Sequence, residues 1–142
     1  MSKLKIGVLI TTLLFILNGC SATLMTYQPK ELTDINSAML IIKDKMDSIP
    51  CQDSVKFVPV TERFIKLDGR FNDGLSLRIT PHKAVGRITL HKKMDSYILT
   101  VSNSFGGFEY RCYLQSEIDA KLLVDSLHTM MKHKPDQYNS EE

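Results

Sequence analysis

The first twenty residues decide how much of this chain is available to fold. Residues 1–5 include Lys3 and Lys5 and no acidic residue, and a largely apolar run of twelve residues follows from Ile6 to Leu17. A helix that crosses the hydrocarbon core of a bilayer needs about 20 apolar residues, so this run is too short for a permanent span and suits the core of a signal peptide. Removal of residues 1–19 leaves about 123 of the 142 residues. That length suits one domain and excludes a multidomain enzyme, a polytopic membrane protein and a repeat array.

The end of the apolar run carries a second signal. It reads Leu17-Asn18-Gly19-Cys20, with a large aliphatic residue three positions before a cysteine and a glycine directly before it. This pattern resembles the lipobox of bacterial lipoproteins, from which Asn18 departs because a small or β-branched residue is usual there. The resemblance implies cleavage between Gly19 and Cys20, a thioether link from Cys20 to diacylglycerol, and acylation of the new amino terminus, with palmitate as an expected acyl group.

The same resemblance implies a location and a membrane partner. Two or three acyl chains make attachment to a membrane effectively permanent. The residue directly after Cys20 is not acidic, and Ser21 in that position resembles the pattern that sorts lipoproteins of enterobacteria-like cells to the outer membrane. We therefore expect a lipid-anchored protein of the bacterial cell envelope, in the outer membrane and facing the periplasm. The alternative is an ordinary secretory leader cut near Ala22, which would release a soluble periplasmic protein.

Assignment of Cys20 to the lipid leaves two cysteines in the chain. Cys51 and Cys112 are then the only intramolecular pair, and an exported chain meets an oxidising compartment. In the chain-entropy model, a crosslink over so long a loop stabilises the fold by about 4 kcal/mol. The alternatives are a metal site or a reactive thiol, but neither cysteine lies in a C-x-x-C motif or a Cys/His cluster. We predict a structural disulfide.

Two segments of the mature chain have helical periodicity. From Thr33 or Asp34, either of which is a good N-cap, apolar residues recur at three- and four-residue steps as far as Pro50. Ser116 is the N-cap of a second such segment, which ends at Pro135. The apolar stripes contain Ile35, Ala38, Met39, Ile42, Met46 and Ile49 in the first helix and Ala120, Leu123, Val124, Leu127, Met130 and Met131 in the second.

Between the two helices the period of the pattern changes from 3.6 to 2. Apolar and polar residues alternate in short runs that are separated by Gly, Pro, Asn and Asp, which predicts strands joined by turns. The predicted strands are residues 55–60, 63–67, 75–79, 86–91, 97–102 and 108–114. Short connections join antiparallel neighbours, so the fold class is α+β, with an antiparallel meander of five or six strands. The N-terminal and C-terminal helices are expected to pack on one face of this sheet and to leave the other face open.

These assignments give the domain organisation. Residues 1–19 are the expected lipoprotein signal peptide, and residues 20–32 a lipidated tether that is polar and contains Pro29. Residues 33–134 form the single α+β domain, and residues 135–142 a disordered tail. A flexible tether of this length spans roughly 20 Å, so the domain is expected to stay close to the membrane.

Motifs of catalysis or metal binding are missing from the sequence. It contains no G-x-S-x-G, no H-E-x-x-H, no phosphate-binding glycine loop and no EF-hand loop. His128 and His133 are five residues apart, about 140° around a helix, so they do not face one metal ion. We therefore expect no catalytic residue, no metal and no cofactor, and a protein that is not an enzyme.

Charge is unevenly distributed along the chain. The 18 Lys and Arg residues and 16 Asp and Glu residues come into balance once Lys3 and Lys5 leave with the leader. No acidic residue lies between Asp73 and Asp95, and five cations accumulate there: Arg78, Lys83, Arg87, Lys92 and Lys93. On alternating strands such residues point away from the core, so the open sheet face is expected to be positive and suited to an anionic surface. The alternative is an ordinary solvated sheet face.

Three hypotheses for function follow. The first is a non-enzymatic, lipid-anchored protein whose domain binds or assembles with another envelope protein, because its leader, size and order of elements are similar to those of small assembly or pilot lipoproteins of secretion systems. The second is a lipid or lipopolysaccharide binder that uses the basic sheet face or a cleft lined by methionines. The third is a small hydrolase. Nucleic acid is not an expected partner in this compartment.

Overall fold

The computed structural model describes residues 21–51, 56–68 and 77–133. The expected signal peptide 1–19, the lipidation site Cys20 and the expected tail 135–142 lie outside the described residues. Within the described ranges, no helix has the length and apolarity that crossing a membrane requires.

The six strands and two helices predicted from the sequence are all present, with ends shifted by at most two residues. One further strand, β1, lies in the segment that was expected to be a tether. The elements are β1 (Thr23–Leu24), α2 (Ile35–Ser48), β2 (Lys56–Val60), β3 (Phe64–Asp68), β4 (Leu77–Pro81), the 3-10 turn η2 (His82–Ala84), β5 (Val85–Lys93), β6 (Ser96–Asn103), β7 (Phe108–Leu114) and α3 (Glu117–Lys132).

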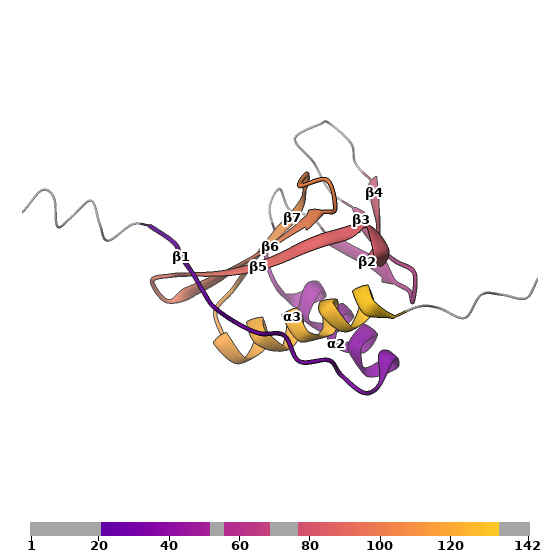
Figure 1. Cartoon of the computed structure of the whole chain (residues 1–142), viewed down its shortest axis with the longest axis horizontal. Helices are drawn as coiled ribbons and strands as arrows, with labels where there is room; N and C mark the ends of the chain where they lie inside the picture. Colours follow the sequence, from indigo (N-terminus) through magenta and orange to yellow (C-terminus); the bar gives the residue numbers. More distant parts are fainter. Residues whose placement is uncertain (1–20, 52–55, 69–76, 134–142) are drawn as a thin grey trace, which may run out of the picture.

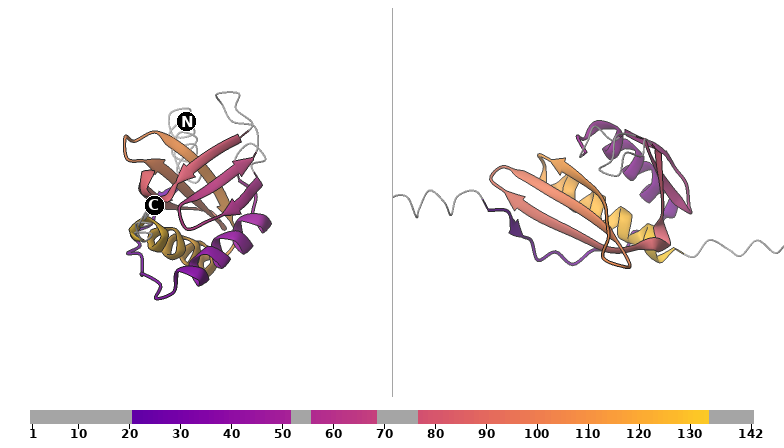
Figure 2. Two further views of the ribbon diagram at one scale, coloured as in Figure 1. Left: turned by 90° about the vertical axis from the view of Figure 1, so that its right-hand side faces the viewer. Right: turned by 90° about the horizontal axis from the view of Figure 1, so that it is seen from above.

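The strands form two antiparallel sheets, so the prediction of a single meander was wrong. One sheet has the order β1-β5-β6-β7 and the other the order β2-β3-β4 (Figures 1 and 2). The break lies between β4 and β5, where Pro81 is followed by η2 and the backbone N–H of His82 donates to the carbonyl of Arg63 at 3.0 Å. The chain changes direction there, and β1 takes the edge of β5 that β4 was expected to occupy.

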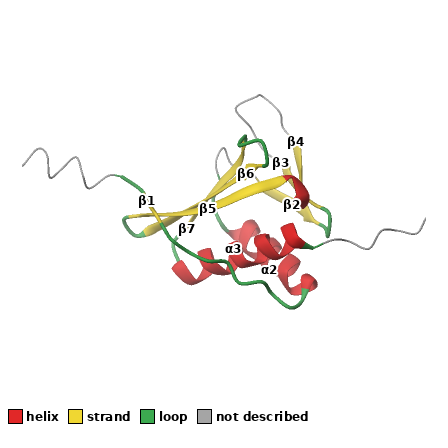
Figure 3. Cartoon of the chain, viewed as in Figure 1, coloured by secondary structure: helices red, strands yellow, loops and turns green. Residues whose placement is uncertain are grey.

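Both helices begin at the caps that the sequence predicts, but they do not pack on one sheet. The carboxylate of Asp34 accepts the backbone N–H groups of Asn36 and Ser37, and the hydroxyl of Ser116 accepts that of Asp119. Helix α3 lies on the four-stranded sheet, in contact with β5, β6 and β7, whereas α2 packs on α3 and on β2 (Figure 3). The two helices therefore form a layer that spans both sheets.

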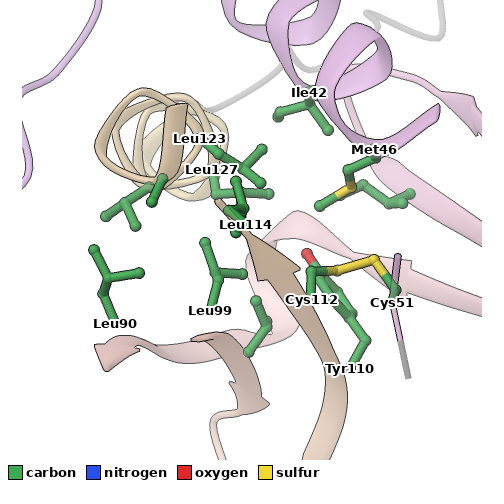
Figure 4. Packing of buried hydrophobic residues seen from close by; sticks show 14 of the residues in the cluster. Ile42, Met46, Cys51, Leu90, Leu99, Tyr110, Cys112, Leu114, Leu123 and Leu127 are labelled. Carbon is green, nitrogen blue, oxygen red and sulfur yellow. A yellow bond between two sulfur atoms is a disulfide. The ribbon is translucent and has the colours of Figure 1, made fainter. Parts of the chain in front are cut away.

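The core lies between α3 and the inner face of the four-stranded sheet and extends under α2. Figure 4 shows Leu99 and Leu114 beside Leu123 and Leu127 of α3, with the disulfide at the side of this cluster. The Cys51–Cys112 disulfide is present, as predicted, and both cysteines are buried. It joins the chain just after α2 to β7, where the N–H of Tyr113 also donates to the carbonyl of Pro50 at 3.0 Å.

We predict that loss of the disulfide weakens the fold substantially. The bond closes a loop with a sequence separation of 61 residues, for which chain entropy gives about 4 kcal/mol. The Cys51→Ala/Cys112→Ala double variant should lose about that much free energy of unfolding in urea. Because alanine also leaves a small cavity, the matched measurement is the wild-type protein with and without a thiol reductant. An unchanged unfolding midpoint on reduction would contradict the prediction.

Residues 23–32 of the segment expected to be a flexible tether are held against the domain, which corrects that expectation for these residues. Thr23 and Leu24 pair with Lys92 and His91 of β5. Further along, Asp125 of α3 is buried, and its carboxylate accepts the hydroxyl of Tyr27 at 2.9 Å and the backbone N–H of Lys30 at 2.8 Å. Burial and the bond to Asp125 raise the pKa of Tyr27 to about 12.

One helical turn after Asp125, the hydroxyl of Thr129 accepts the backbone N–H of Leu32 at 2.9 Å. We call the hydrogen bonds to Asp125 and Thr129 the clamp. The side chains of Met25, Tyr27 and Leu32 pack against the core. Pro29 disfavours a helix here, but it is compatible with an extended segment whose backbone N–H groups are satisfied by side chains of α3.

We predict that Asp125 holds this segment in place. Asp125→Ala leaves two donors without an acceptor and should lower the free energy of unfolding by about 2 kcal/mol. Amide exchange at Leu32 should then be at least about tenfold faster, since 1.4 kcal/mol corresponds to a factor of ten. Tyr27→Phe removes one of the two donors and should have a smaller effect, and Asp47→Ala, at an exposed position of α2, is the control. Equal exchange at Leu32 in Asp125→Ala and Asp47→Ala would exclude a clamp.

Candidate functional site

The four-stranded sheet separates its side chains cleanly between two faces. Three rows of paired residues face the helices: Thr23, Lys92, Tyr97 and Leu114; Leu90, Leu99 and Cys112; Ile88, Val101 and Tyr110. Most of these side chains are buried, including Leu90, Leu99, Val101, Cys112 and Leu114. The rows between them must point the other way, because side chains alternate along a strand.

The opposite face carries a row that crosses all four strands and two shorter rows. We call this surface the open face, and its rows are Leu24, His91, Ile98 and Tyr113; Thr89, Thr100 and Arg111; Arg87, Ser102 and Phe108. Lys93, two residues beyond His91, extends the open face toward the β5–β6 turn. Ile98 and Tyr113 are half-buried, whereas Leu24 is 60% exposed.

A β-bulge in β7 determines which charged side chains of that strand lie on the open face. The register shifts between Val101 and Ser102, so that Ser102 pairs with Phe108 and Glu109 becomes the extra residue. The Glu109 carboxylate accepts the hydroxyl of Thr80 at 3.1 Å and the side-chain amide of Asn103 at 3.0 Å. The bulge thus turns the acidic residue of this strand toward β4 and leaves Phe108 in the outward row.

Arg111 and Phe108 lie in neighbouring rows of the open face on β7. The guanidinium carbon of Arg111 lies 5.5 Å from the centroid of the Phe108 ring, and its Nε donates to the hydroxyl of Thr100 at 3.3 Å. Both interactions hold a long side chain in one conformation, which reduces the entropy that a binding partner would have to remove. Arg87 lies in the same row as Phe108 and is exposed. The rows named above contain no Asp or Glu among their described residues, so the open face is positive.

The structure divides the five cations that the sequence grouped together. Arg87 and Lys93 lie on the open face. Lys92 lies on the opposite face, with its Nζ 5.7 Å from the centroid of the Tyr97 ring, and Lys83 belongs to η2. Arg78 pairs with Leu67 in the three-stranded sheet, and its side chain lies outside the described part of the structure.

Sequence reasoning missed Arg111 as a member of this surface. Its alternation with Tyr110 and Cys112 already placed it away from the core, but a search for acid-free stretches passed over it because Glu109 is its near neighbour. Only the bulge separates these two charges.

Two histidines, His82 and His133, make contacts within the domain. His82 is buried, its Nε2 lies 2.9 Å from the carbonyl of Thr61, and burial lowers its pKa. His133 lies 3.9 Å from a carboxylate oxygen of Glu62 at the end of α3. In the described ranges, no group of three His, Cys, Asp or Glu side chains is placed to hold a metal ion.

Comparison of this chain with protein-family models, with curated proteins and with solved structures found no match.

Proposed function

We propose that this chain is a lipid-anchored protein of the bacterial cell envelope, attached through Cys20 to the outer membrane and facing the periplasm, and that its domain is a non-enzymatic binding module. The sequence Leu17-Asn18-Gly19-Cys20 supports the anchor. The open face supports the binding role, and one observation carries it: cations and apolar side chains occupy adjacent rows with no acidic side chain between them.

The composition of the open face favours a protein partner over a lipid head-group layer. Arg and aromatic residues are enriched at protein interfaces and among the side chains that contribute most to binding, and the open face presents Arg87, Arg111, Phe108 and Tyr113. The threonines between them supply hydroxyl groups on a flat, regular surface. The partner that complements this face carries acidic groups around an apolar centre.

The anchor is tested by lipidation in cells. Radiolabelled palmitate should be incorporated into the wild-type chain, and the labelled protein should sediment with membranes. Both the label and the sedimentation should be lost in Cys20→Ser. Cys51→Ala, which leaves Cys20 intact, is the matched control for loss of a cysteine. Absence of label from the wild-type chain, or continued sedimentation of Cys20→Ser with vesicles, would refute the anchor.

The binding role is tested with a photocrosslinking residue in place of Thr89, which lies in the middle row of the open face. One discrete protein should be captured in cells, and Arg87→Glu should reduce its yield about tenfold, equivalent to about 1.4 kcal/mol. Lys83→Glu is the matched control, because it reverses the charge of an exposed residue of η2 that belongs to neither the open face nor the strands that form it. Equal yields from the two charge reversals would refute a role for the open face.

The same variants distinguish a lipid-binding domain. If the domain from Ser21 onward sediments with anionic vesicles at low salt and Arg87→Glu prevents this, the open face binds lipid and the protein-binding proposal is wrong.

A further inference from the structure

Three large apolar side chains are exposed at one end of the domain, and each comes from a different element. Leu24 of β1 is 60% exposed, Met94 of the β5–β6 turn 72%, and Ile118 in the first turn of α3 79%. A soluble domain has no structural need for such a set in one place, whereas burial of apolar surface against another phase is favourable.

Pairing and hydrogen bonds place these residues at the same end. Thr23 pairs with Lys92, which brings β1 to the end of β5 that leads into the turn at Met94. The hydroxyl of Tyr97, just after that turn, donates to the carboxylate of Glu117 at 3.0 Å, and Glu117 directly precedes Ile118. Figure 2 shows β1 and the β5–β6 hairpin at one end of the molecule, away from the β6–β7 turn.

Met94 occupies its position at a conformational cost. Its φ is 53°, and within the described residues no other non-glycine residue has a positive φ. Gly or Asn would adopt this conformation more readily. An exposed methionine does not stabilise a turn in this conformation. Its presence therefore points to a contact outside the domain.

Charge at this end is also suited to a negative surface. Lys92 and Lys93 precede Met94 and are exposed, and the exposed Asp95 that follows offsets one of these charges, so the turn keeps a net positive charge. Two acidic residues of the first turn of α3 are already neutralised, because Glu117 pairs with Lys121 at 2.7 Å and Asp119 with Lys45 at 3.0 Å.

The short length of chain between Cys20 and β1 limits how far the domain can lie from the lipid proposed at Cys20. Cys20 precedes Thr23 by three residues, so at most about 11 Å of extended chain can separate them. Since β1 is paired with β5 and the following segment is clamped to Asp125, the whole domain would be held by a link this short.

We propose that this end is the surface by which the domain rests on the bilayer. Leu24, Met94 and Ile118 enter the boundary between head groups and acyl chains, and Lys92 and Lys93 contact anionic head groups. The proposal rests on the lipid anchor proposed above, which supplies the attachment, and adds the orientation of the domain relative to the membrane.

The chain contains no tryptophan, so single replacements give site-specific fluorescent reporters. Met94→Trp, Ile118→Trp and Phe105→Trp, each in the lipidated full-length protein, are reconstituted in vesicles of phosphatidylethanolamine and phosphatidylglycerol with brominated acyl chains. Phe105 is 96% exposed in the β6–β7 turn and is the matched control. Quenching at positions 94 and 118 should be at least twofold stronger than at 105, with emission at shorter wavelength.

A second variant tests the side chain rather than the position. Met94→Asn suits the backbone conformation and removes the apolar group, so it should leave the unfolding midpoint equal or higher while it weakens quenching of a reporter at 118. Equal quenching at 94, 118 and 105, strongest quenching at 105, or no quenching at all in these protein-free vesicles would overturn the orientation. The mass of the same samples reports lipidation, so an unmodified Cys20 refutes the anchor, whereas a lipidated chain without selective quenching refutes the orientation alone.

Discussion

The attachment of the N-terminal segment to α3 is the constraint on which the arrangement of the molecule depends. The carboxylate of Asp125 and the hydroxyl of Thr129 accept backbone N–H groups from Lys30 and Leu32, and Asp125 also accepts the hydroxyl of Tyr27. Without these contacts, residues 21–32 would lose the hydrogen bonds that fix the segment along α3. With them, the segment runs along the helix, β1 reaches the edge of β5, and the entry of the chain is fixed at one end of the sheet.

The two faces of the four-stranded sheet have different surroundings because α3 lies on only one of them. The inner face is covered by α3 and is apolar, and the disulfide joins it to the end of α2. No described helix covers the outer face, which carries Arg87, Arg111 and the half-buried side chains of Ile98 and Tyr113. If the end with Met94 rests on a bilayer, the strands of this sheet rise from the membrane and the open face stands beside it, within reach of another envelope protein. The two proposed surfaces adjoin and share Leu24 and Lys93, but Arg87, Arg111 and Phe108 belong to the open face alone and Met94 and Ile118 to the end alone. One face can therefore bind a partner while the end of the domain contacts lipid.

Much of the secondary structure could be predicted because it depends on neighbours in the sequence. Asp34 and Ser116 cap their helices through side chains that reach only two or three residues, and Pro50 lies where the first helix must end. The alternation of Tyr97, Leu99 and Val101 gave the buried face of β6. The disulfide followed from counting: with Cys20 assigned to a lipid, two cysteines in an exported chain have one way to pair.

The sequence alone therefore determined the helices, the six longer strands, the disulfide partners and the apolar faces, since each is fixed by local geometry or by the number of groups available. Tertiary structure decided the rest. The split into two sheets depends on the turn at His82 and on β1 taking the edge of β5, and both are contacts between distant residues. The charge of the open face depends on a single bulge at Glu109, because one extra residue reverses which side chains point outward. No local sequence pattern predicts this bulge, because the Glu109 carboxylate is held by hydrogen bonds from Thr80 and Asn103, which the fold brings to it.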